Sequence, residues 1–381
     1  MFGKSYTLFT LFGFKVRLDL TWLILAVLIA WTLAEGWFPY HHPGLAREVY
    51  WAMGLTTGIA LLLSIVFHEL SHSLVARRYG LSISGITLFI FGGVAQMERE
   101  PGSPKAELLM AAAGPAASFV LAGVAYGLLL AARQVGLPTP VTGVVLYVVY
   151  MNAVLAIFNL IPAFPLDGGR VLRAILWHFK HDLRAATRVS SNLGKGLAFL
   201  LIGLGALSAL GGNLIGGLWY LLIGMFLHGA AQQSYRHVVM REELRGETVD
   251  EFMTRNVVTV SPRTTLDELM DAYVYKYHFK MFPVTRDDMV LGWVGAQDVQ
   301  QVHREEWPQT RVEAILHPVS DDNSVDPEAP ALTALSLMNR TGQSRLMVIR
   351  DQRLKGVISI KDLLRFIARR TDQEGLTGGE D

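Results

Sequence analysis

The chain has 381 residues, of which 51% are hydrophobic and only 18% are charged. So apolar a composition excludes an ordinary soluble protein and points to membrane spans, and the formal net charge of +1 gives no sign of a nucleic-acid partner. Because the chain contains no cysteine, it has no disulfide, no thiolate zinc site and no cysteine nucleophile, so a bound metal must be held by His, Asp or Glu.

Six stretches can each cross the hydrocarbon core of a bilayer, which is about 30 Å thick and takes about 20 apolar residues. The predicted spans cover residues 18–38, 50–70, 106–132, 141–161, 193–210 and 214–228. The segment before the first span is mildly basic, and no small-residue cleavage site follows that span. We therefore interpret it as a retained first span and not as a signal peptide.

The second span ends in the sequence His68-Glu69-x-x-His72. In a helix the two histidines lie one turn apart on one face and can bind one metal ion, and Glu69 beside them can accept a proton from water. The ten residues before His68 carry no charge, and an ionisable cluster at membrane depth indicates a functional site. The alternative is a chance match, because this motif alone has many false positives.

Residues 85–95, between the second and third spans, are β-prone and contain the pair Gly92-Gly93. This pattern predicts a hairpin and not a further span. Non-helical backbone at membrane depth is tolerated only where protein buries it or where it lines a cavity. We therefore expect the hairpin to lie beside the metal site.

A catalytic zinc takes three protein ligands, so a third ligand must come from another part of the chain. The fourth span closes with two helix-breaking prolines, Pro162 and Pro165, followed by Asp167 at the same depth as the histidine pair. Asp167 is the candidate, although it can instead cap the helix that follows. Glu98 and Asp182 are the next candidates.

The distribution of Lys and Arg predicts the orientation in the membrane. With the N-terminus inside and an even number of spans, the outer loops hold only Arg47 and Arg133. The inner loops then hold Lys4, Lys15, Arg17, Arg77, Arg78, Arg99, Lys105, Arg170, Arg173, Lys180, Arg184, Arg188, Lys195 and Arg236. We expect a multi-pass protein of the cell membrane with both termini cytoplasmic and the metal motif near the cytoplasmic end of its span.

The composition changes near residue 246, and a helix-strand-strand-helix pattern then occurs twice at an offset of 64 residues. The predicted domains are a membrane domain at 1–236, a linker at 237–246, a tandem module at 247–370 with copies 247–305 and 311–370, and a disordered tail at 371–381. The two copies resemble CBS domains, which pair into a module that often binds adenine nucleotides.

In the CBS family a Gly-x-x-Ser/Thr-x-x-Asp turn faces the phosphate and ribose of the nucleotide. The second copy matches this turn with Gly356, Ser359 and Asp362, whereas the first copy has Gly295 where the hydroxyl is expected. The resemblance implies ATP or AMP as a ligand of the second copy. A purely structural or dimerising pair is the alternative.

The membrane half resembles the site-2 protease family of intramembrane metalloproteases. The resemblance rests on His68-Glu69-x-x-His72, Gly92-Gly93, Gly114-Pro115 and Asn159-x-x-Pro162-x-x-Pro165-Leu166-Asp167-Gly168. It implies His68, His72 and Asp167 as the ligands of Zn²⁺ and Glu69 as the general base. It also implies Asn159 near the substrate backbone or the developing oxyanion, and it gives Asn152 and the Gly92-Gly93 pair as substrate-binding positions.

The predicted fold is a polytopic α-helical membrane protein, with six transmembrane helices and a membrane-associated β-hairpin, followed by a cytoplasmic α/β CBS tandem. The predicted function is that of an intramembrane zinc endopeptidase. It cleaves transmembrane segments of membrane-anchored substrates in regulated intramembrane proteolysis, and the CBS pair is a nucleotide-responsive regulator. The expected partners are a substrate helix, the lipid bilayer and an adenine nucleotide but no nucleic acid, and CBS pairs often form homodimers.

Two alternatives belong to other functional classes. A CBS-regulated transporter requires pore-lining charges or internal repeats in the membrane half, and the sequence has neither. A catalytically inactive protein that binds a membrane partner is expected to lack a ligand or the base, whereas all four residues are present.

Overall fold

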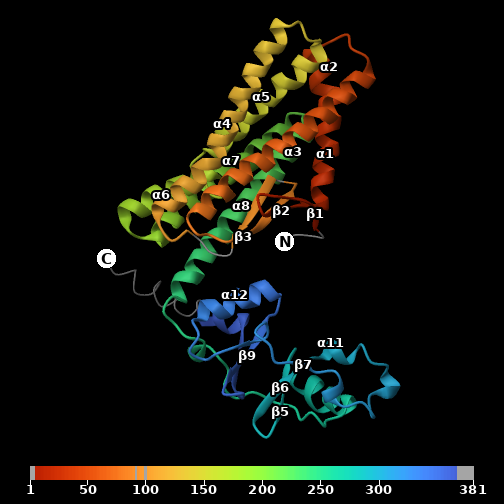
Figure 1. Cartoon of the computed structure of the whole chain (residues 1–381), viewed down its shortest axis with the longest axis vertical. Helices are drawn as coiled ribbons and strands as arrows, with labels where there is room; N and C mark the ends of the chain where they lie inside the picture. The colour runs from red at the N-terminus through yellow and green to blue at the C-terminus, as the bar shows by residue number, and fades with distance from the viewer. Residues whose placement is uncertain (1–4, 91, 98–100, 367–381) are drawn as a thin grey trace. The chain divides into compact units, whose positions relative to one another are not determined.

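A computed structural model describes residues 5–90, 92–97 and 101–366 (Figure 1). The chain divides into two compact units, Met1–Val238 and Val239–Asp381, which are described separately below. The predicted disordered tail at 371–381 and the candidate ligand Glu98 lie outside the described residues.

Five helical segments among the described residues are long and apolar enough to cross a membrane. They are Leu20–His41, which joins α1 (Leu20–Thr32), the π-helical turn η1 (Leu33–Trp37) and α2 (Phe38–His41), and the helices α3 (Arg47–Arg78), α4 (Pro104–Gln134), α5 (Thr139–Asn159) and α7 (Leu183–Leu210). The predicted sixth span lies inside α8 (Leu214–Glu243), which is not one of these five. A membrane protein with several apolar helices is therefore confirmed, and the count of six spans stays a prediction.

Helix starts follow the local sequence. Asp19 caps α1 by accepting a hydrogen bond from the Thr21 amide, and Ser103 caps α4 with Pro104 in the first turn. At 1.5 Å per residue, the 32 residues of α3 extend about 48 Å, well beyond a hydrocarbon core of about 30 Å. The histidine motif therefore lies in the last third of a helix that is longer than the membrane needs.

A four-stranded sheet lies against the end of α3 that carries the histidines (Figure 1). Its order is β1 (Ser5–Leu11), β2 (Phe14–Asp19), β3 (Ile83–Phe89) and β4 (Gly92–Met97), with β2 parallel to β3 and the other pairs antiparallel. The hairpin expected at 85–95 is thus β3–β4, and its membrane location stays a prediction. Val16, Ile86 and Leu88 are fully buried against the helices, and each such side chain contributes about 1.5–3 kcal/mol.

The first two strands were missed by the sequence analysis, which described the segment before the first span only as mildly basic and began that span at residue 18. The structure instead forms a hairpin over 5–19, and α1 begins at Leu20. The alternation of buried Phe14 and Val16 with exposed Lys15 is a strand pattern that the basic residues obscured.

The second unit contains a six-stranded sheet in the order β5 (Phe282–Arg286), β6 (Met289–Val294), β10 (Arg353–Ser359), β9 (Arg345–Arg350) and β8 (Ser324–Val325), with β7 (His317–Pro318) paired to β6. The two-residue turns Asp287-Asp288 and Asp351-Gln352 both have positive φ and occupy equivalent places in the repeat. The main short helices are α11 (Ala296–Val299) and α12 (Ala331–Thr341).

Each copy of the repeat completes the other copy's core. Val249, Phe252 and Met253, which begin the first copy, are buried with α12 and β9 of the second copy. In return Val312, which begins the second copy, is buried among the residues of the first. Because of this exchange, the two copies form one folding unit.

Candidate active site

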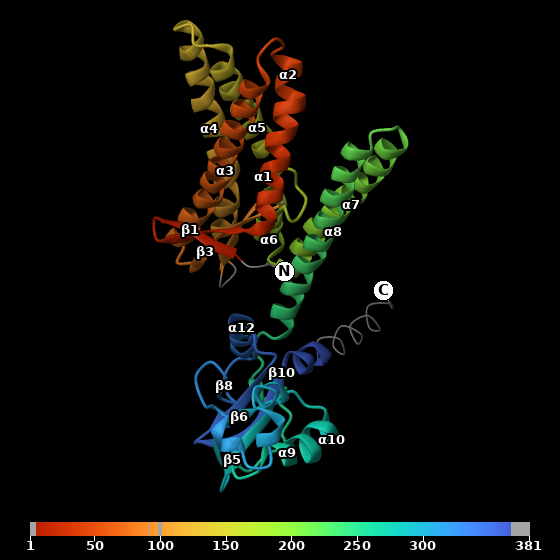
Figure 2. The ribbon, with the colours of Figure 1, turned by 90° about the vertical axis from the view of Figure 1, so that its right-hand side faces the viewer.

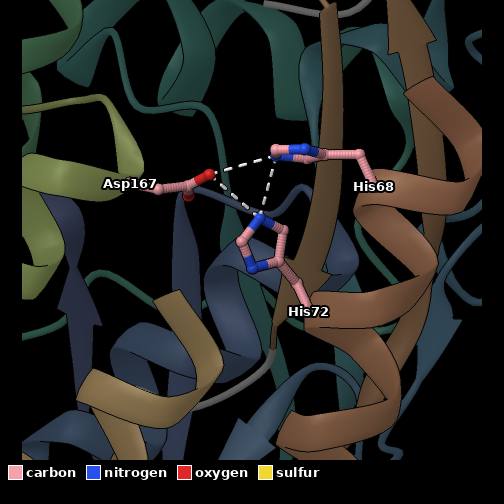
Figure 3. Close-up of side chains that lie close together, drawn as sticks. All are labelled: His68, His72 and Asp167. Atoms are coloured by element: carbon pink, nitrogen blue, oxygen red, sulfur yellow. Dashed lines mark hydrogen bonds and ion pairs between the residues drawn. The ribbon is translucent and has the colours of Figure 1, made fainter. Parts of the chain in front are cut away.

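Two histidines of α3 and one aspartate at the start of α6 (Asp167–Lys180) direct their side chains at a common point (Figure 3). The Nε2 atoms of His68 and His72 lie 3.2 Å apart, and each lies 3.1 Å from Oδ2 of Asp167. Both imidazoles are buried, and the Asp167 side chain is only 13% exposed. The structure therefore brings Asp167 to two histidines from which it is 95 and 99 positions distant in the sequence.

Contacts at the Nδ1 atoms of the two histidines fix the orientation of their rings. His72 Nδ1 lies 2.7 Å from the Met110 carbonyl oxygen, which can only accept, so Nδ1 carries the proton and Nε2 has a free lone pair. His68 Nδ1 lies 2.9 Å from the buried hydroxyl of Ser118. A lone pair on Nε2 and a carboxylate oxygen at 3.1 Å repel each other unless a cation lies between them.

The spacing of these atoms fits zinc. With Zn–N and Zn–O bonds of about 2.0–2.1 Å, the ligand atoms of a tetrahedral site lie about 3.3 Å apart, and the observed separations are 3.1–3.2 Å. Burial raises the pKa of the Asp167 carboxyl, but when the His72 and His68 rings are protonated, their positive charge outweighs burial and holds this pKa well below its usual value. The aspartate is therefore an anion at neutral pH, as a metal ligand must be.

A glycine of α4 makes room for the metal. A Cβ atom added to Gly114 would lie 2.5 Å from His68 Nε2 and would also overlap the His72 ring. Any side chain at this position would enter the space where the three ligand atoms converge. Pro115 follows within the helix, so Gly114 is the residue of the Gly114-Pro115 pair that lies against the ligand atoms.

The backbone of β4 covers the side chain of Glu69. A Cβ atom added to Gly93 would lie 2.5 Å from Glu69 Cγ and 3.0 Å from Cδ, so only glycine permits this approach. Gly92 has φ of +131°, in the region that favours glycine. The Gly92-Gly93 pair thus lets β4, the end strand of the sheet, pass close to Glu69, the residue next to His68.

A tightly packed loop brings Asp167 to the histidines. Gly168 lies against the backbone of Leu160 and Ile161, and Gly169 lies against that of Ala163 and Phe164, so neither position has space for a Cβ atom. Leu166 is the N-cap residue of α6, and no side chain makes a capping hydrogen bond there. The carboxylate of Asp167 is therefore directed to the imidazoles and does not cap the helix.

Of the other two candidates for the third ligand, Asp182 is not part of this cluster. Asp182 caps α7, where its Oδ1 accepts a hydrogen bond of 2.9 Å from the Ala185 amide. Glu98 lies outside the described residues.

A buried ion pair ties α6 to α4 near the site. Glu107 is fully buried and Arg173 is 3% exposed; Nε of Arg173 donates a hydrogen bond of 2.6 Å to Oε1 of Glu107. Glu107 lies one turn before Met110, whose carbonyl meets His72. The ion pair therefore joins α6, which begins with Asp167, to α4, whose Met110 carbonyl and Ser118 hydroxyl contact the two imidazoles.

The two asparagines that the resemblance gave make hydrogen bonds outside the ligand cluster, and their roles stay predictions. Asn159 ends α5, and its Nδ2 donates to the Leu155 carbonyl in its own helix at 3.0 Å. Asn152 is 1% exposed, and its Nδ2 donates to the Ser64 hydroxyl of α3 at 3.0 Å. No hydrogen bond joins either asparagine to the metal-site cluster among the interactions of the described residues.

Apart from Gly114, which it named only as part of the family resemblance, the sequence analysis did not identify the residues that support the ligands. On α4, Glu107, Met110, Gly114 and Ser118 recur at helical spacing and form the face toward α3 and α6. The spacing of a buried glycine and polar residues in an apolar span was the available signal. The Met110 contact uses a backbone carbonyl, for which no side-chain signal exists.

The tandem module contains a cleft of about 490 Å³ at the junction of its two copies. It is lined by Phe279, Lys280, Met281, Trp293, Gly295, Ala296, Gln297, Asp298, Gln343, Ser344 and Arg345. The cleft therefore contains the turn of the first copy, in which Gly295 stands where the CBS pattern expects a hydroxyl. In the second copy, Ser359 and Asp362 hydrogen-bond to each other at 2.5 Å, and Gly356 packs against the Thr254 carbonyl.

Comparison with known proteins gives matches to both halves of the chain. The profile of peptidase family M50 matches residues 56–145 and 139–203, and that of the CBS domain matches 249–304 and 312–369. Zinc metalloprotease MJ0392 of Methanocaldococcus jannaschii is 30% identical over 96% of both chains. The Synechocystis protein sll0528, named provisionally as a zinc metalloprotease, is 32% identical over 89% of both chains. A solved site-2 protease from Methanocaldococcus jannaschii is 33% identical over 60% of this chain and 94% of its own, with a TM-score of 0.42.

Proposed function

This chain belongs to peptidase family M50, the family of the site-2 proteases, and we propose that it cleaves membrane-embedded segments with a zinc ion held by His68, His72 and Asp167. It is a membrane-bound zinc metalloprotease with a CBS module. The observation that carries the ligand assignment is the convergence of one ligand atom from each of the three residues, all within 4.8 Å of one another. The transporter and inactive-binder alternatives are not favoured by the family membership.

Zinc bound at this position supplies Lewis acidity, which polarises a substrate carbonyl and lowers the pKa of water. Glu69, half-buried beside the ligands, accepts the proton of the attacking water and donates it to the leaving amine. The Met110 carbonyl and the Ser118 hydroxyl keep the two rings in orientation throughout.

The substrate in this proposal is a transmembrane helix that unwinds before cleavage, because a helix hides its carbonyls in its own hydrogen bonds. β4 is an end strand of the four-stranded sheet and its Gly93 contacts Glu69, so a segment paired to β4 would run past the base. Asn159 would turn from the Leu155 carbonyl toward the oxyanion. Asn152, buried against Ser64, would hold α5 on α3 instead of contacting substrate.

The distribution of Lys and Arg supports six spans with both termini in the cytoplasm, because a large excess of these residues then lies on one side. In that orientation the metal site opens toward the inner leaflet, and the CBS module is cytoplasmic. Tagging residue 5 and residue 366 and measuring protease accessibility in right-side-out vesicles checks both termini.

An adenine nucleotide is the ligand that we propose for the cleft of the tandem module. Phe279 and Trp293 offer apolar surface to a base, Lys280 and Arg345 offer cations to phosphates, and Asp298 offers a carboxylate to ribose hydroxyls. Asp298 already accepts a hydrogen bond of 2.8 Å from the Gly295 amide, which fixes its carboxylate at the cleft wall.

The two turns of the module give a matched pair of variants for this ligand. In the full-length protein, Asp298→Ala should remove the binding heat of ATP or AMP, whereas Asp362→Ala should leave it nearly unchanged. The reverse result would put the ligand on the second turn, as the sequence pattern suggested. No heat for the unaltered protein with either nucleotide would leave the module a structural or dimerising pair.

The proteolytic function is tested by quantitative proteomics of membranes from cells that carry either the unaltered protein or Glu69→Gln. Gln preserves the shape of Glu69 but cannot act as a base. Membrane-anchored proteins that accumulate uncut only with Glu69→Gln would be candidate substrates. Identical membrane proteomes under every condition in which the protein is made would contradict the proposal.

A further inference from the structure

The hairpin formed by β1 and β2 carries an apolar surface that no other part of the described chain covers. Tyr6 is 58% exposed, Leu8 47%, Phe9 40% and Phe12 63%. A bulge between Thr7 and Phe9 interrupts the pairing of the two strands, and every described residue from Ser5 to Thr10 is exposed. A soluble protein avoids so apolar an end strand, because it invites aggregation.

Phe12, at the tip of the hairpin, has a backbone conformation that is unfavourable for a large side chain. The turn is Phe12-Gly13, with φ of +50° at Phe12 and +88° at Gly13. Turns of this type strongly favour Asn, Asp or Gly at the first position, and a bulky residue there is an outlier that suggests a function. The Phe12 ring gains nothing from the fold, because it is the most exposed of the four side chains.

The hairpin directly precedes the first candidate span. β2 ends at Asp19, which caps α1, and the first candidate span begins at the next residue, Leu20. In both views the strands lie across the axis of α1 at one end of that helix (Figures 1 and 2). The polar layer on each side of a bilayer is about 5–8 Å deep, so a hairpin attached directly to α1 reaches into this layer.

Neighbouring residues match the chemistry of the layer. Nη1 of Arg77, in the last turn of α3, donates a hydrogen bond of 2.8 Å to the Phe12 carbonyl, and its guanidinium lies 5.0 Å from the centre of the Phe14 ring. Lys15 and Arg78 are exposed close by in the chain or on the same helix. Cations beside exposed aromatic and aliphatic side chains suit lipid phosphates next to the ends of acyl chains.

From these observations we propose that the β1–β2 hairpin is seated in the membrane interface, with the side chains of Phe12 and Leu8 among the phospholipids. The hairpin and the site share one sheet, because β2 pairs with β3 and β3 pairs with β4, whose Gly93 covers Glu69. An anchored hairpin therefore holds the strand beside the catalytic glutamate at a constant depth in the membrane.

The absence of native cysteine permits a direct test with single-cysteine variants and no background labelling. Phe12→Cys places a nitroxide at the tip, Val27→Cys places one on α1 as a lipid-facing control, and Tyr275→Cys places one on the second unit as an aqueous control. The three native side chains have similar exposure, at 63%, 70% and 57%. Leu8→Cys replaces the tip variant if Phe12→Cys fails to fold.

The full-length protein is reconstituted into vesicles of phosphatidylcholine and phosphatidylglycerol. Power-saturation EPR then compares collisions of each label with oxygen, which partitions into lipid, and with a water-soluble nickel chelate. The proposal predicts that the oxygen-to-nickel collision ratio at Phe12 lies between those of Tyr275 and Val27 and several-fold above that of Tyr275. A ratio equal to that of Tyr275 would place the hairpin in water. Low collision rates with both reagents would show that protein covers it, and either result would overturn the proposal.

Discussion

Gly114 gives the most specific structural prediction about the metal site, because the site has no space for a side chain there. The Cβ atom of alanine at this position would lie 2.5 Å from His68 Nε2, whereas an ordinary contact begins near 3.4 Å. The ring must therefore move by about 0.9 Å. Metal–ligand distances tolerate deviations of about 0.2 Å, so Gly114→Ala should displace at least one ligand.

The expected loss of zinc affinity is at least about 100-fold, which is the upper end for losing a group that only orients a ligand. A 100-fold change corresponds to about 2.8 kcal/mol. Gly123→Ala on the same helix is the matched control, because an added Cβ there meets nothing within 4 Å. This control should bind zinc normally and should unfold at the same or a slightly higher temperature, since alanine favours a helix over glycine.

Zinc affinity is measured by competition with a chelating indicator in detergent, and thermal unfolding is followed with and without zinc. Gly114→Ala should unfold at the same temperature whether or not zinc is added, whereas the unaltered protein and Gly123→Ala should gain stability from zinc. A zinc affinity of Gly114→Ala within threefold of the unaltered protein would refute the placement of the metal beside α4.

Four further variants test the site and its support. Glu69→Gln should retain one zinc per chain and lose cleavage by a factor of about 10²–10⁴, as metal analysis and a cleavage assay on one preparation would measure; cleavage within tenfold of normal would exclude the general-base role. Asp167→Ala should lose zinc, because two histidines leave the ion under-coordinated; unchanged zinc on elemental analysis would move the third ligand elsewhere. Glu107→Ala leaves Arg173 buried without its partner, which should lower the free energy of unfolding by about 3–5 kcal/mol. The double variant Glu107→Leu with Arg173→Met should recover most of this stability, as thermal unfolding would measure. Equal losses in the single and the double variant would show that the charges are not paired as described.

The sequence predicted the parts of the fold that depend on local pattern. Long apolar runs predicted the helices, a glycine pair predicted the hairpin at 85–95, and an internal offset predicted the two copies of the second unit. The histidine pair follows from helical periodicity alone, because positions 68 and 72 must share a face. Asp167 was preferred over Asp182 and Glu98 because it follows two helix-breaking prolines at the depth of the histidine pair, and the family resemblance implied the same residue.

Other features depend on packing between distant segments, and the sequence analysis missed them. The strands at 5–19 were missed because the segment that contains Lys15 and Arg17 was interpreted only by its mildly basic composition. The role of Gly114 depends on how closely α4 crosses α3, which no single-sequence pattern reports. The cleft of the tandem module lies at the turn containing Gly295, although the second copy has the better match to the CBS turn, because both copies contribute to its walls.

Cleavage in a defined membrane tests the central claim most directly. The purified full-length protein and Glu69→Gln are reconstituted separately with a model transmembrane helix, and mass spectrometry identifies the products. We predict that the zinc-loaded protein cuts a peptide bond within the membrane-embedded segment, that a chelator stops the reaction and added zinc restores it, and that Glu69→Gln with equal zinc content yields no product. Equal cleavage by Glu69→Gln, or cleavage that continues after the zinc is removed, would contradict this account.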